Sequence, residues 1–380
     1  MYAIACLQGM VFYGPVATLY RQAAGVTIFQ ITIIESISLA LCILLEVPWG
    51  IVADKIGYRR TMILSCGLFF VSKIIFWQAN GFGGFLMERV LLSIVFAGMS
   101  GVDASMLYLS SERGMSQRAF GVYHNLGMTG LLAAAAVYSC FIGQNYRLAG
   151  LLTAISYGAA ALLAFALQEV KTPEDACKRR AGLFRALFKQ TLANRRLMLL
   201  VLAAALLNET HQTITVFLNQ LQYVKAGMAP GVIAAVYILT TVSGLLGGLS
   251  ARITDRFGPR GTGLSLFLLC CVACVALAVT SNAIVSVLAV VALRVGHSLF
   301  QPLQTELQNR AITAENRATA LSLNAVFMNA IAVLTNLGFG RIAEIDLGFA
   351  MLFGCTLCAV GYVLYLIACK GGIRPRANSR

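Results

Sequence analysis

Apolar stretches of about 20 residues recur along the whole sequence, and they limit the folds that this chain can adopt. An α-helix needs roughly 20 mostly apolar residues to cross the ~30 Å hydrocarbon core of a bilayer. A segment in lipid must also satisfy its own backbone hydrogen bonds, which a helix does. The sequence therefore predicts twelve membrane-spanning helices, at about residues 2–20, 28–51, 62–80, 84–109, 119–142, 147–167, 197–219, 231–252, 262–281, 283–303, 318–340 and 347–369.

The composition agrees with this prediction. Hydrophobic residues make up 59% of the chain and charged residues only 12%, whereas a soluble domain carries about 25% charged residues. Polar residues are too few to cover a soluble core of this size. We therefore expect an all-α membrane protein in which most apolar side chains face lipid or other helices.

Basic residues are concentrated after the even-numbered predicted spans, and the formal net charge of the chain is +14. The positive-inside rule places these loops, the long central loop and both termini in the cytoplasm. We expect a multi-pass protein of the cell (inner) membrane with no nucleic-acid partner; binding of anionic lipid headgroups is an alternative role for these charges. The residues concerned include Lys55, Arg59, Arg60, Arg113, Arg118, Lys178, Arg179, Arg180, Arg252, Arg256, Arg260, Arg310 and Arg317.

One long polar stretch, residues 168–196, divides the predicted spans six and six. A charge run of this kind is usually a solvated segment, and residues 183–192 could form an interfacial helix within it. We predict an N-terminal six-helix bundle over residues 1–167, a cytoplasmic linker over 168–196, a C-terminal six-helix bundle over 197–370 and a cytoplasmic tail over 371–380.

The two halves of the sequence repeat each other. Residues 50–60 and residues 251–260 share an acid, a glycine three residues later and an arginine two residues beyond the glycine. Residues 11–25 resemble residues 216–227 at a similar offset, about 201 residues. Two similar bundles in the same orientation imply a pseudo-two-fold axis along the membrane normal and a solute site between them near the midplane.

The first copy of the repeated motif consists of Gly50, Asp54, Gly57, Arg59 and Arg60. Here the chain resembles members of the major facilitator superfamily over essentially its whole length, because these residues match that family's loop signature between helices two and three. Tyr58 departs from the signature where the family commonly has a basic residue, and Ala251 replaces the first glycine of the second copy. The resemblance implies the fold of that family, two pseudo-symmetric bundles of six helices.

Physical reasons can be given for the residue types of this motif. Gly50 would let two helices approach closely, Gly57 would permit a tight turn with positive φ, and Asp54 could accept hydrogen bonds while pairing with an arginine. The resemblance implies a conformational latch that joins helix two to helix eleven, whereas a plain basic loop is the alternative reading. We expect Asp54 and Arg60 at its centre, Asp103 or Glu112 as partners, and Asp255, Gly258 and Arg260 in the second copy.

Ionisable residues inside membrane spans are costly, so each is a functional candidate until a structural partner is found. Glu35 and Lys73 fall at a similar predicted depth, so that they could pair, and Arg89 lies at a similar depth beside Glu88. A structural ion pair and direct contact with substrate or protons are both open for Glu35, Lys73 and Arg89.

Glu209 and Arg294 fall near the midplane of their predicted spans. The resemblance implies that helices one, four, seven and ten line a central cavity, which would contain both residues. A buried carboxylate near a cation or histidine can bind and release a proton as access alternates. We therefore expect proton coupling, with a structural Glu209–Arg294 pair as the alternative. Further candidates on these helices are Asn208, His211, His297 and Gln301.

Aromatic residues add one further candidate. Tyr13 could face the cavity, whereas Tyr20 and Tyr223 are expected to be interfacial anchors. Most of the 11 cysteines lie in apolar stretches and are expected to pack as small hydrophobic residues, so we expect neither a metal site nor a cofactor.

These features together predict a secondary active transporter that moves a small solute by alternating access and is coupled to protons, with export of drugs or metabolites as one option. The alternatives are a facilitated uniporter or a proton symporter for a sugar or organic anion, and then a non-transporting receptor. An intramembrane enzyme is disfavoured because no zinc motif or nucleophile elbow occurs. We expect a monomer that contacts membrane lipids, a small-molecule substrate and protons.

Overall fold

The computed structural model describes residues 1–99, 102–110, 116–169, 194–311 and 317–369, with only the backbone at 46–47, 50–55, 104, 116–118, 311 and 317–322. Every regular element in these ranges is a helix. Eleven stretches of the described chain are long and apolar enough to cross a membrane. One of them, Pro230–Val279, is 50 residues long and contains two of the predicted spans, which reconciles this number with the twelve expected.

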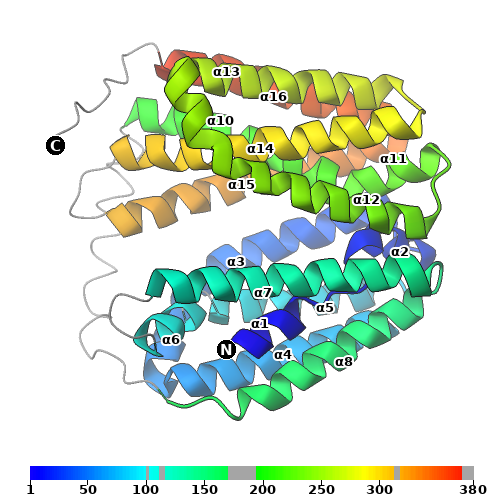
Figure 1. Cartoon of the computed structure of the whole chain (residues 1–380), viewed down its shortest axis with the longest axis vertical. Helices are drawn as coiled ribbons and strands as arrows, with labels where there is room; N and C mark the ends of the chain where they lie inside the picture. Colours follow the sequence, from blue (N-terminus) through cyan, green and yellow to red (C-terminus); the bar gives the residue numbers. More distant parts are fainter. Residues whose placement is uncertain (100–101, 111–115, 170–193, 312–316, 370–380) are drawn as a thin grey trace. The chain divides into compact units, whose positions relative to one another are not determined.

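The described helices form two compact units, which Figure 1 shows with their labels. Unit 1 contains α1 (Tyr2–Gly9), η1 (Gly14–Val16), α2 (Ala17–Ala23), α3 (Ile28–Ile56), α4 (Tyr58–Gln78), α5 (Phe82–Met99), α6 (Val102–Ser110), α7 (Ser116–Val137), η2 (Tyr138–Ile142) and α8 (Tyr146–Ala164), together with residues 227–239. Most of the predicted linker, including residues 183–192, lies outside the described residues.

Unit 2 contains α10 (Arg195–Gln212), η3 (Thr213–Leu218), α11 (Asn219–Lys225), η4 (Gly244–Leu249), α13 (Ser250–Val279), α14 (Ala283–Ala311), α15 (Arg317–Ile345) and α16 (Leu347–Cys369). The helix α12 (Pro230–Ser243) contributes its last residues to this unit. The predicted tail, residues 371–380, lies outside the described chain.

The same pattern of helix contacts occurs in both units. In unit 1, α1 packs on α7 and α8, α4 packs on α5 and α8, and α3 packs on α5. In unit 2, α10 packs on α15 and α16, α13 packs on α14 and α16, and η4 packs on α14. These are equivalent neighbour pairs when the second half of the sequence is aligned with the first, so the structure confirms the predicted repeat of two helical bundles.

Turns with positive φ mark the repeat at the level of the backbone. Gly25 (φ 84°) and Gly227 (φ 79°) form one pair, and Gly57 (φ 88°) and Gly258 (φ 71°) form the other. Side chains with a Cβ rarely adopt this conformation, whereas glycine does so readily. The predicted turn at Gly57 is therefore confirmed, and Gly258 makes the equivalent turn inside α13.

The first span is a broken helix, since α1 ends at Gly9 and helical structure resumes only at Gly14. Side chains of α8 satisfy backbone groups around this break. The amide of Phe12 donates to Thr153 Oγ1 (3.0 Å), and the hydroxyl of Tyr157 donates to the carbonyl of Gln8 (2.7 Å). Neighbouring helices thus supply the hydrogen bonds that a break within a membrane requires.

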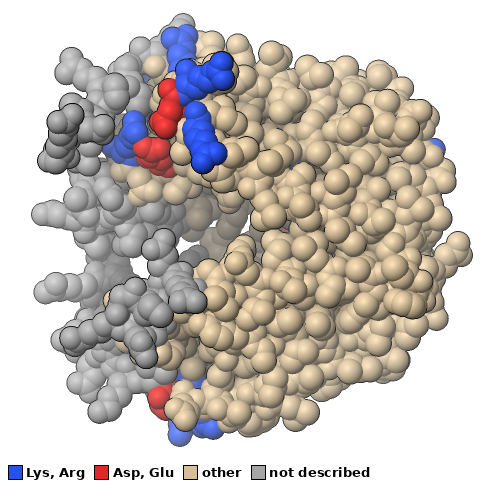
Figure 2. Space-filling model, viewed as in Figure 1, with Lys and Arg blue, Asp and Glu red and all other residues tan. Residues whose placement is uncertain are grey.

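The surface of each unit is that of a membrane protein. Large apolar side chains are exposed in both units, among them Phe141 and Leu162 in unit 1 and Val279 and Leu334 in unit 2. Figure 2 shows, on its visible face, that charged side chains gather at helix ends, whereas the middle of the helices carries almost none. Apolar exposure on this scale would be a liability in water but suits contact with lipid.

Candidate functional site

Glu35 bridges two arginines in the interior of unit 1. Its Oε1 accepts a hydrogen bond from Arg21 Nη1 (3.4 Å), and its Oε2 accepts from Arg89 Nη2. The sequence suggested a pair between Glu35 and Lys73 instead, and this pairing is wrong. Depth along a helix was similar for all these residues, but the direction in which each side chain points could not be derived from depth.

Lys73 is the centre of a second buried cluster. Its Nζ donates to Glu88 Oε1 (3.1 Å) and to the hydroxyl of Tyr13 (2.9 Å), and it lies 5.5 Å from the ring centroid of Tyr157. Only 4% of Lys73 and 1% of Glu88 are exposed. Tyr13 is therefore a buried partner of Lys73 rather than a residue facing open space.

The two clusters connect several helices of unit 1. Arg21 comes from α2, Glu35 from α3, Lys73 from α4, and Glu88 and Arg89 from α5. Buried charges must be compensated by partners of opposite sign, because an isolated charge is very costly to bury. This geometry favours a structural ion-pair role for the membrane charges of unit 1.

Tyr20 and Tyr223 were expected at the membrane interface, yet both are buried. The hydroxyl of Tyr20 donates to the carbonyl of Trp77 (3.2 Å), and its ring stacks on Phe76. Aromatic residues near a predicted span end can equally pack inward, and near Tyr20 the helix is also broken. The expectation of surface anchors was therefore wrong for both tyrosines.

Two histidines and an arginine meet in unit 2. The rings of His211 on α10 and His297 on α14 stack with centroids 3.9 Å apart and an interplanar angle of 4°. Arg294 Nη1 lies 3.4 Å from His211 Nε2, and Thr215 Oγ1 lies 3.2 Å from the same nitrogen. A Cβ at Gly244 would be 2.8 Å from Arg294 Nε, so the missing side chain makes room for the guanidinium.

The contact with Arg294 favours one tautomer of His211. A guanidinium has only donors, so the contact of 3.4 Å is a hydrogen bond from Arg294 when His211 Nε2 carries a lone pair. The imidazole of His211 is then neutral with its proton on Nδ1. Adding a proton at Nε2 would place a cation directly against the guanidinium, which like-charge repulsion opposes.

Other candidates of unit 2 lie on the same helices. Glu209 is buried, and its Oε1 accepts from the hydroxyl of Thr213 (2.8 Å). Asn208 Nδ2 donates to Gln304 Oε1 (3.5 Å). Gln301 is exposed on α14.

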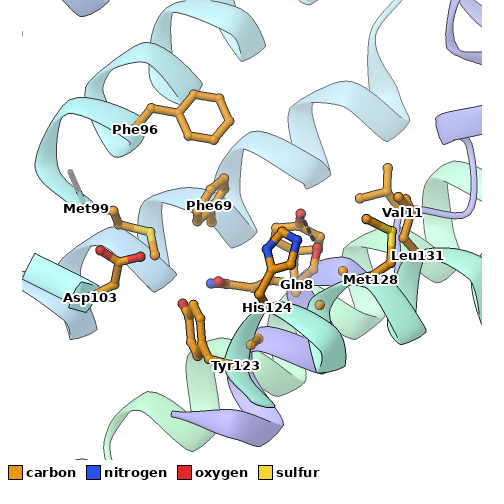
Figure 3. Close-up of a pocket in the computed structure, with 14 residues that line it drawn as sticks. Gln8, Val11, Phe69, Phe96, Met99, Asp103, Tyr123, His124, Met128 and Leu131 are labelled. Carbon is orange, nitrogen blue, oxygen red and sulfur yellow. Dashed lines mark hydrogen bonds between the residues drawn. The ribbon is translucent and has the colours of Figure 1, made fainter. Parts of the chain in front are cut away.

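Unit 1 also contains a cavity of about 660 Å³, shown in Figure 3. Helices α1, α4, α5, α6, α7 and α8 all contribute to its wall. Asp103, Tyr123 and Gln8 approach one another from three of these helices, and His124 lies beside them (Figure 3). The remaining wall is apolar, with Phe69, Phe96, Met99, Met128 and Leu131 among its residues.

Asp103 was assigned to the latch from the sequence, and no residue had been assigned to this cavity. Tyr123 and His124 were missed, although two adjacent polar residues in an apolar span were a usable signal. The cavity itself could not be predicted, because six separate helices form it. Among the described residues, no three His, Cys, Asp or Glu side chains come close enough to hold a metal ion.

The predicted latch is only partly within the described chain. Arg59 donates to the carbonyls of Leu167 (2.5 Å) and Phe165 (3.1 Å) at the end of α8, and its amide donates to Glu169 Oε1 (3.2 Å). A cation at a helix C-terminus and a carboxylate at a helix N-terminus are both favourable placements. Arg59 therefore fastens α4 to α8 within unit 1, a role that the sequence did not indicate.

The other latch residues divide into two groups. Arg60 is exposed at the start of α4, and Asp255 and Arg260 are exposed on either side of the Gly258 turn in α13. Tyr365 on α16 donates to the carbonyl of Pro259 (2.7 Å) beside this turn. Glu112 and the side chain of Asp54 lie outside the described residues, as does the surrounding of Gly50. The latch as a whole therefore stays a prediction.

The sequence matches a family model. The model described as "Major Facilitator Superfamily" matches residues 1–336 of the chain. No curated protein matches the sequence at a significant level.

Solved structures with a similar fold are transporters by their descriptions. A variant of the nucleoside transporter NupG has a TM-score of 0.84 and 14% identity, with 97% of this chain and 99% of that chain covered. A bacterial homologue of the human lysosomal transporter Spinster has a TM-score of 0.77 and 17% identity, covering 97% and 94%. A D-xylose–proton symporter has a TM-score of 0.74 and 13% identity, covering 97% and 96%. At these identities the likeness concerns the fold alone.

Proposed function

Because this chain belongs to the major facilitator superfamily, we propose that it is a secondary transporter that moves a small solute by alternating access in exchange or together with protons. It carries no loop for binding nucleotide phosphates of the Gly-x-x-x-x-Gly-Lys-Ser/Thr type. The energy for transport would therefore come from a gradient. We place it in the cell (inner) membrane with both termini in the cytoplasm, on the basis of its basic loops.

The observation that carries proton coupling is the contact between Arg294 and His211. His211 Nε2 can accept a proton only when the guanidinium no longer donates to it. Proton uptake is then linked to a displacement of Arg294 on α14 relative to α10, because the proton and the guanidinium compete for one lone pair. A ligand shifts a conformational equilibrium only through different affinities for the two states, and this competition provides such a difference for the proton.

His297 is a second site at which this cluster could bind a proton. Its ring is stacked on His211 at 3.9 Å, so both imidazoles can be neutral together, but two charged rings at this distance would repel. The pair would therefore hold one proton at a time. Glu209, two residues before His211 on α10, is a further acceptor through which a proton could leave.

The test starts with a solute. Purified protein is screened by thermal shift against sugars, nucleosides, amino acids, organic anions and cationic drugs, because a ligand that binds the folded state stabilises it. Proteoliposomes that contain a pH-sensitive dye then report whether adding the stabilising solute drives proton movement. Coupled transport predicts a change of internal pH that depends on the solute.

Variants of the two histidines test whether these residues couple solute transport to protons. We expect His211→Gln and His297→Gln to reduce solute-driven proton flux at least about tenfold, equivalent to about 1.4 kcal/mol, while the thermal shift caused by the solute persists. Gln212→Ala is the control, because Gln212 follows His211 on α10 but is exposed. Solute uptake without any proton movement in the unaltered protein would favour a uniporter and overturn the proposal.

A further inference from the structure

The two buried ion clusters of unit 1 contain more cations than carboxylates. Arg21 and Arg89 share the carboxylate of Glu35, and Lys73 is paired with Glu88. An opposite charge in contact favours the charged form of an ionisable side chain. The two clusters therefore carry three positive and two negative charges. Among the side chains that the structure describes there, one positive charge is in excess.

This excess belongs to the pair of arginines. The described carboxylates whose charge acts on Arg89 are those of Glu35 and Glu88, and Lys73 already neutralises the second of them. The side chains of Arg21 and Glu35 are only 4% and 8% exposed. Because an uncompensated charge is very costly to bury, an anion bound beside these arginines would be stabilised far more than an anion at an exposed arginine.

Each of the two arginines also has a donor that is not used. The Nε atoms of Arg21 and Arg89 are buried, and neither has a hydrogen-bond partner among the described residues. Their contacts with Glu35 are made by Nη1 and Nη2 instead. A buried charged donor without an acceptor is costly, and a guanidinium has no acceptor of its own. The cluster therefore favours a negatively charged acceptor.

Aromatic rings limit the size of an anion that fits beside Arg21. The guanidinium carbon of Arg21 lies 5.9 Å from the ring centroid of Phe76 and 6.0 Å from that of Phe85. Both rings are fully buried, so a bulky organic acid would have to displace packed side chains. The side chain of Arg89, by contrast, is 23% exposed, and a small ion can approach the cluster from that side.

From these observations we infer that unit 1 binds one small inorganic anion, chloride, beside Arg21 and Arg89. The ion stays in place as a counter-charge of the buried cluster. This inference goes beyond the proposed function, because chloride is here neither the transported solute nor the source of energy. Its binding requires no gradient and can be measured in detergent.

The experiment replaces gluconate, which is too large for the site, by chloride at constant sodium concentration and ionic strength. The purified full chain is studied in a neutral detergent. The line width of the chloride NMR signal reports binding, and thermal unfolding reports its effect on stability. We expect a broadening above that of empty micelles that saturates. We also expect a thermal midpoint at least about 2 °C higher in chloride, because a ligand that binds the folded state stabilises it.

Variants test whether the excess charge is responsible. Arg89→Gln makes the positive and negative charges of the clusters equal and should abolish both chloride effects, whereas Arg89→Lys keeps the charge and should retain them. Arg21→Gln removes the excess at the other arginine, so it should also abolish both effects and is an independent test. Arg310→Gln is the matched control, because it removes a positive charge from an exposed pair with Glu306 and should change neither effect.

The outcomes separate this inference from the proposed function. Equal line widths and equal thermal midpoints in chloride and gluconate would overturn the anion site. Chloride effects in folded Arg89→Gln and Arg21→Gln variants that match those of Arg310→Gln would also overturn it. Chloride binding that depends on these arginines, in a protein whose solute movement carries no protons, would leave the site intact and refute coupling. Proton-coupled transport by a protein that does not respond to chloride would do the reverse.

Discussion

Gly244 has no Cβ and thereby leaves room for the side chain of Arg294 in the histidine cluster. A Cβ added there would meet the end of the Arg294 side chain at 2.8 Å from Nε and 3.1 Å from Nη2. That end is flexible, so the fold can adjust at small cost, but the guanidinium would no longer lie in the same place against His211. A substitution at Gly244 should therefore move the guanidinium of Arg294 without destabilising the fold.

We expect Gly244→Ala to leave the thermal midpoint within about 2 °C of the unaltered protein and to reduce solute-driven proton flux several-fold. The measurement is proton flux in proteoliposomes alongside thermal unfolding in detergent. Gly248→Ala is the matched control, because Gly248 lies in the same short helix η4 and nothing lies within 4 Å of the position where its Cβ would be. Equal flux in both variants would show that the place of Arg294 does not matter.

Glu35 is expected to act mainly on stability. Replacing it with glutamine leaves Arg21 and Arg89 without their shared carboxylate, and breaking a buried ion pair in this way costs about 3–5 kcal/mol. Glu306→Gln, which alters an exposed pair with Arg310, should cost less than about 1 kcal/mol. Unfolding in denaturant, followed by circular dichroism, compares the two, and similar losses would contradict a structural role for Glu35.

The sequence identified the charged residues inside the membrane spans but not the residues with which they pair. Glu35, Lys73 and Arg89 were recognised as buried charges, because a charge inside an apolar span needs a reason to be there. Their partners depend on the rotation of each helix about its axis. Arg21 follows the first predicted span, residues 2–20, whereas the structure places it in a buried position in α2 after the break in that span.

Close contact of backbones joins α1 to α7. A Cβ at Gly130 would meet the carbonyl oxygen of Cys6, and one at Gly9 would meet the carbonyl oxygen of Gly127. Small residues at such contacts let membrane helices approach closely. Both helices also line the unit 1 cavity, so their separation sets its width.

We predict that Gly130→Val destabilises the protein by about 1–3 kcal/mol, the usual cost of overpacking, because backbone atoms cannot move aside as a flexible side chain can. Thermal unfolding in detergent measures this. Gly121→Val on the same helix should be close to neutral, since nothing lies within 4 Å of the position where its Cβ would be. A Gly130→Val variant as stable as Gly121→Val would show that the two helices separate freely.

Most helices could be predicted from apolar length alone, and the details of their interior could not. The break after α1 is accompanied by hydrogen bonds from Thr153 and Tyr157 on α8. Apolar length gives no sign of this break or of the π-helical segments η2 and η3. The 50-residue stretch from Pro230 to Val279 shows the same limit, because η4 and the Gly258 turn connect two predicted spans without a loop.

At the scale of the whole molecule, the repeat was the most reliable guide. The motif around Gly57 and Gly258 predicted two equivalent bundles, and the helix contacts within each unit confirm them. The clusters of polar side chains described above are distributed less symmetrically between the units. Unit 1 holds the ion-pair clusters and the aromatic cavity, and unit 2 holds the histidine cluster, so solute and proton chemistry would have to be connected through a shared conformational change.

Accumulation of a solute against its gradient tests the central claim most directly. Proteoliposomes with the membrane potential held near zero are given a pH difference of one unit, which supplies about 1.4 kcal/mol per proton, enough for about a tenfold concentration ratio in one-to-one coupling. The account predicts that the solute found by thermal shift accumulates several-fold, that reversing the pH difference reverses the direction, and that His297→Gln abolishes both effects. A concentration ratio that stays at one whatever the pH difference, in protein that still equilibrates the solute, would contradict it.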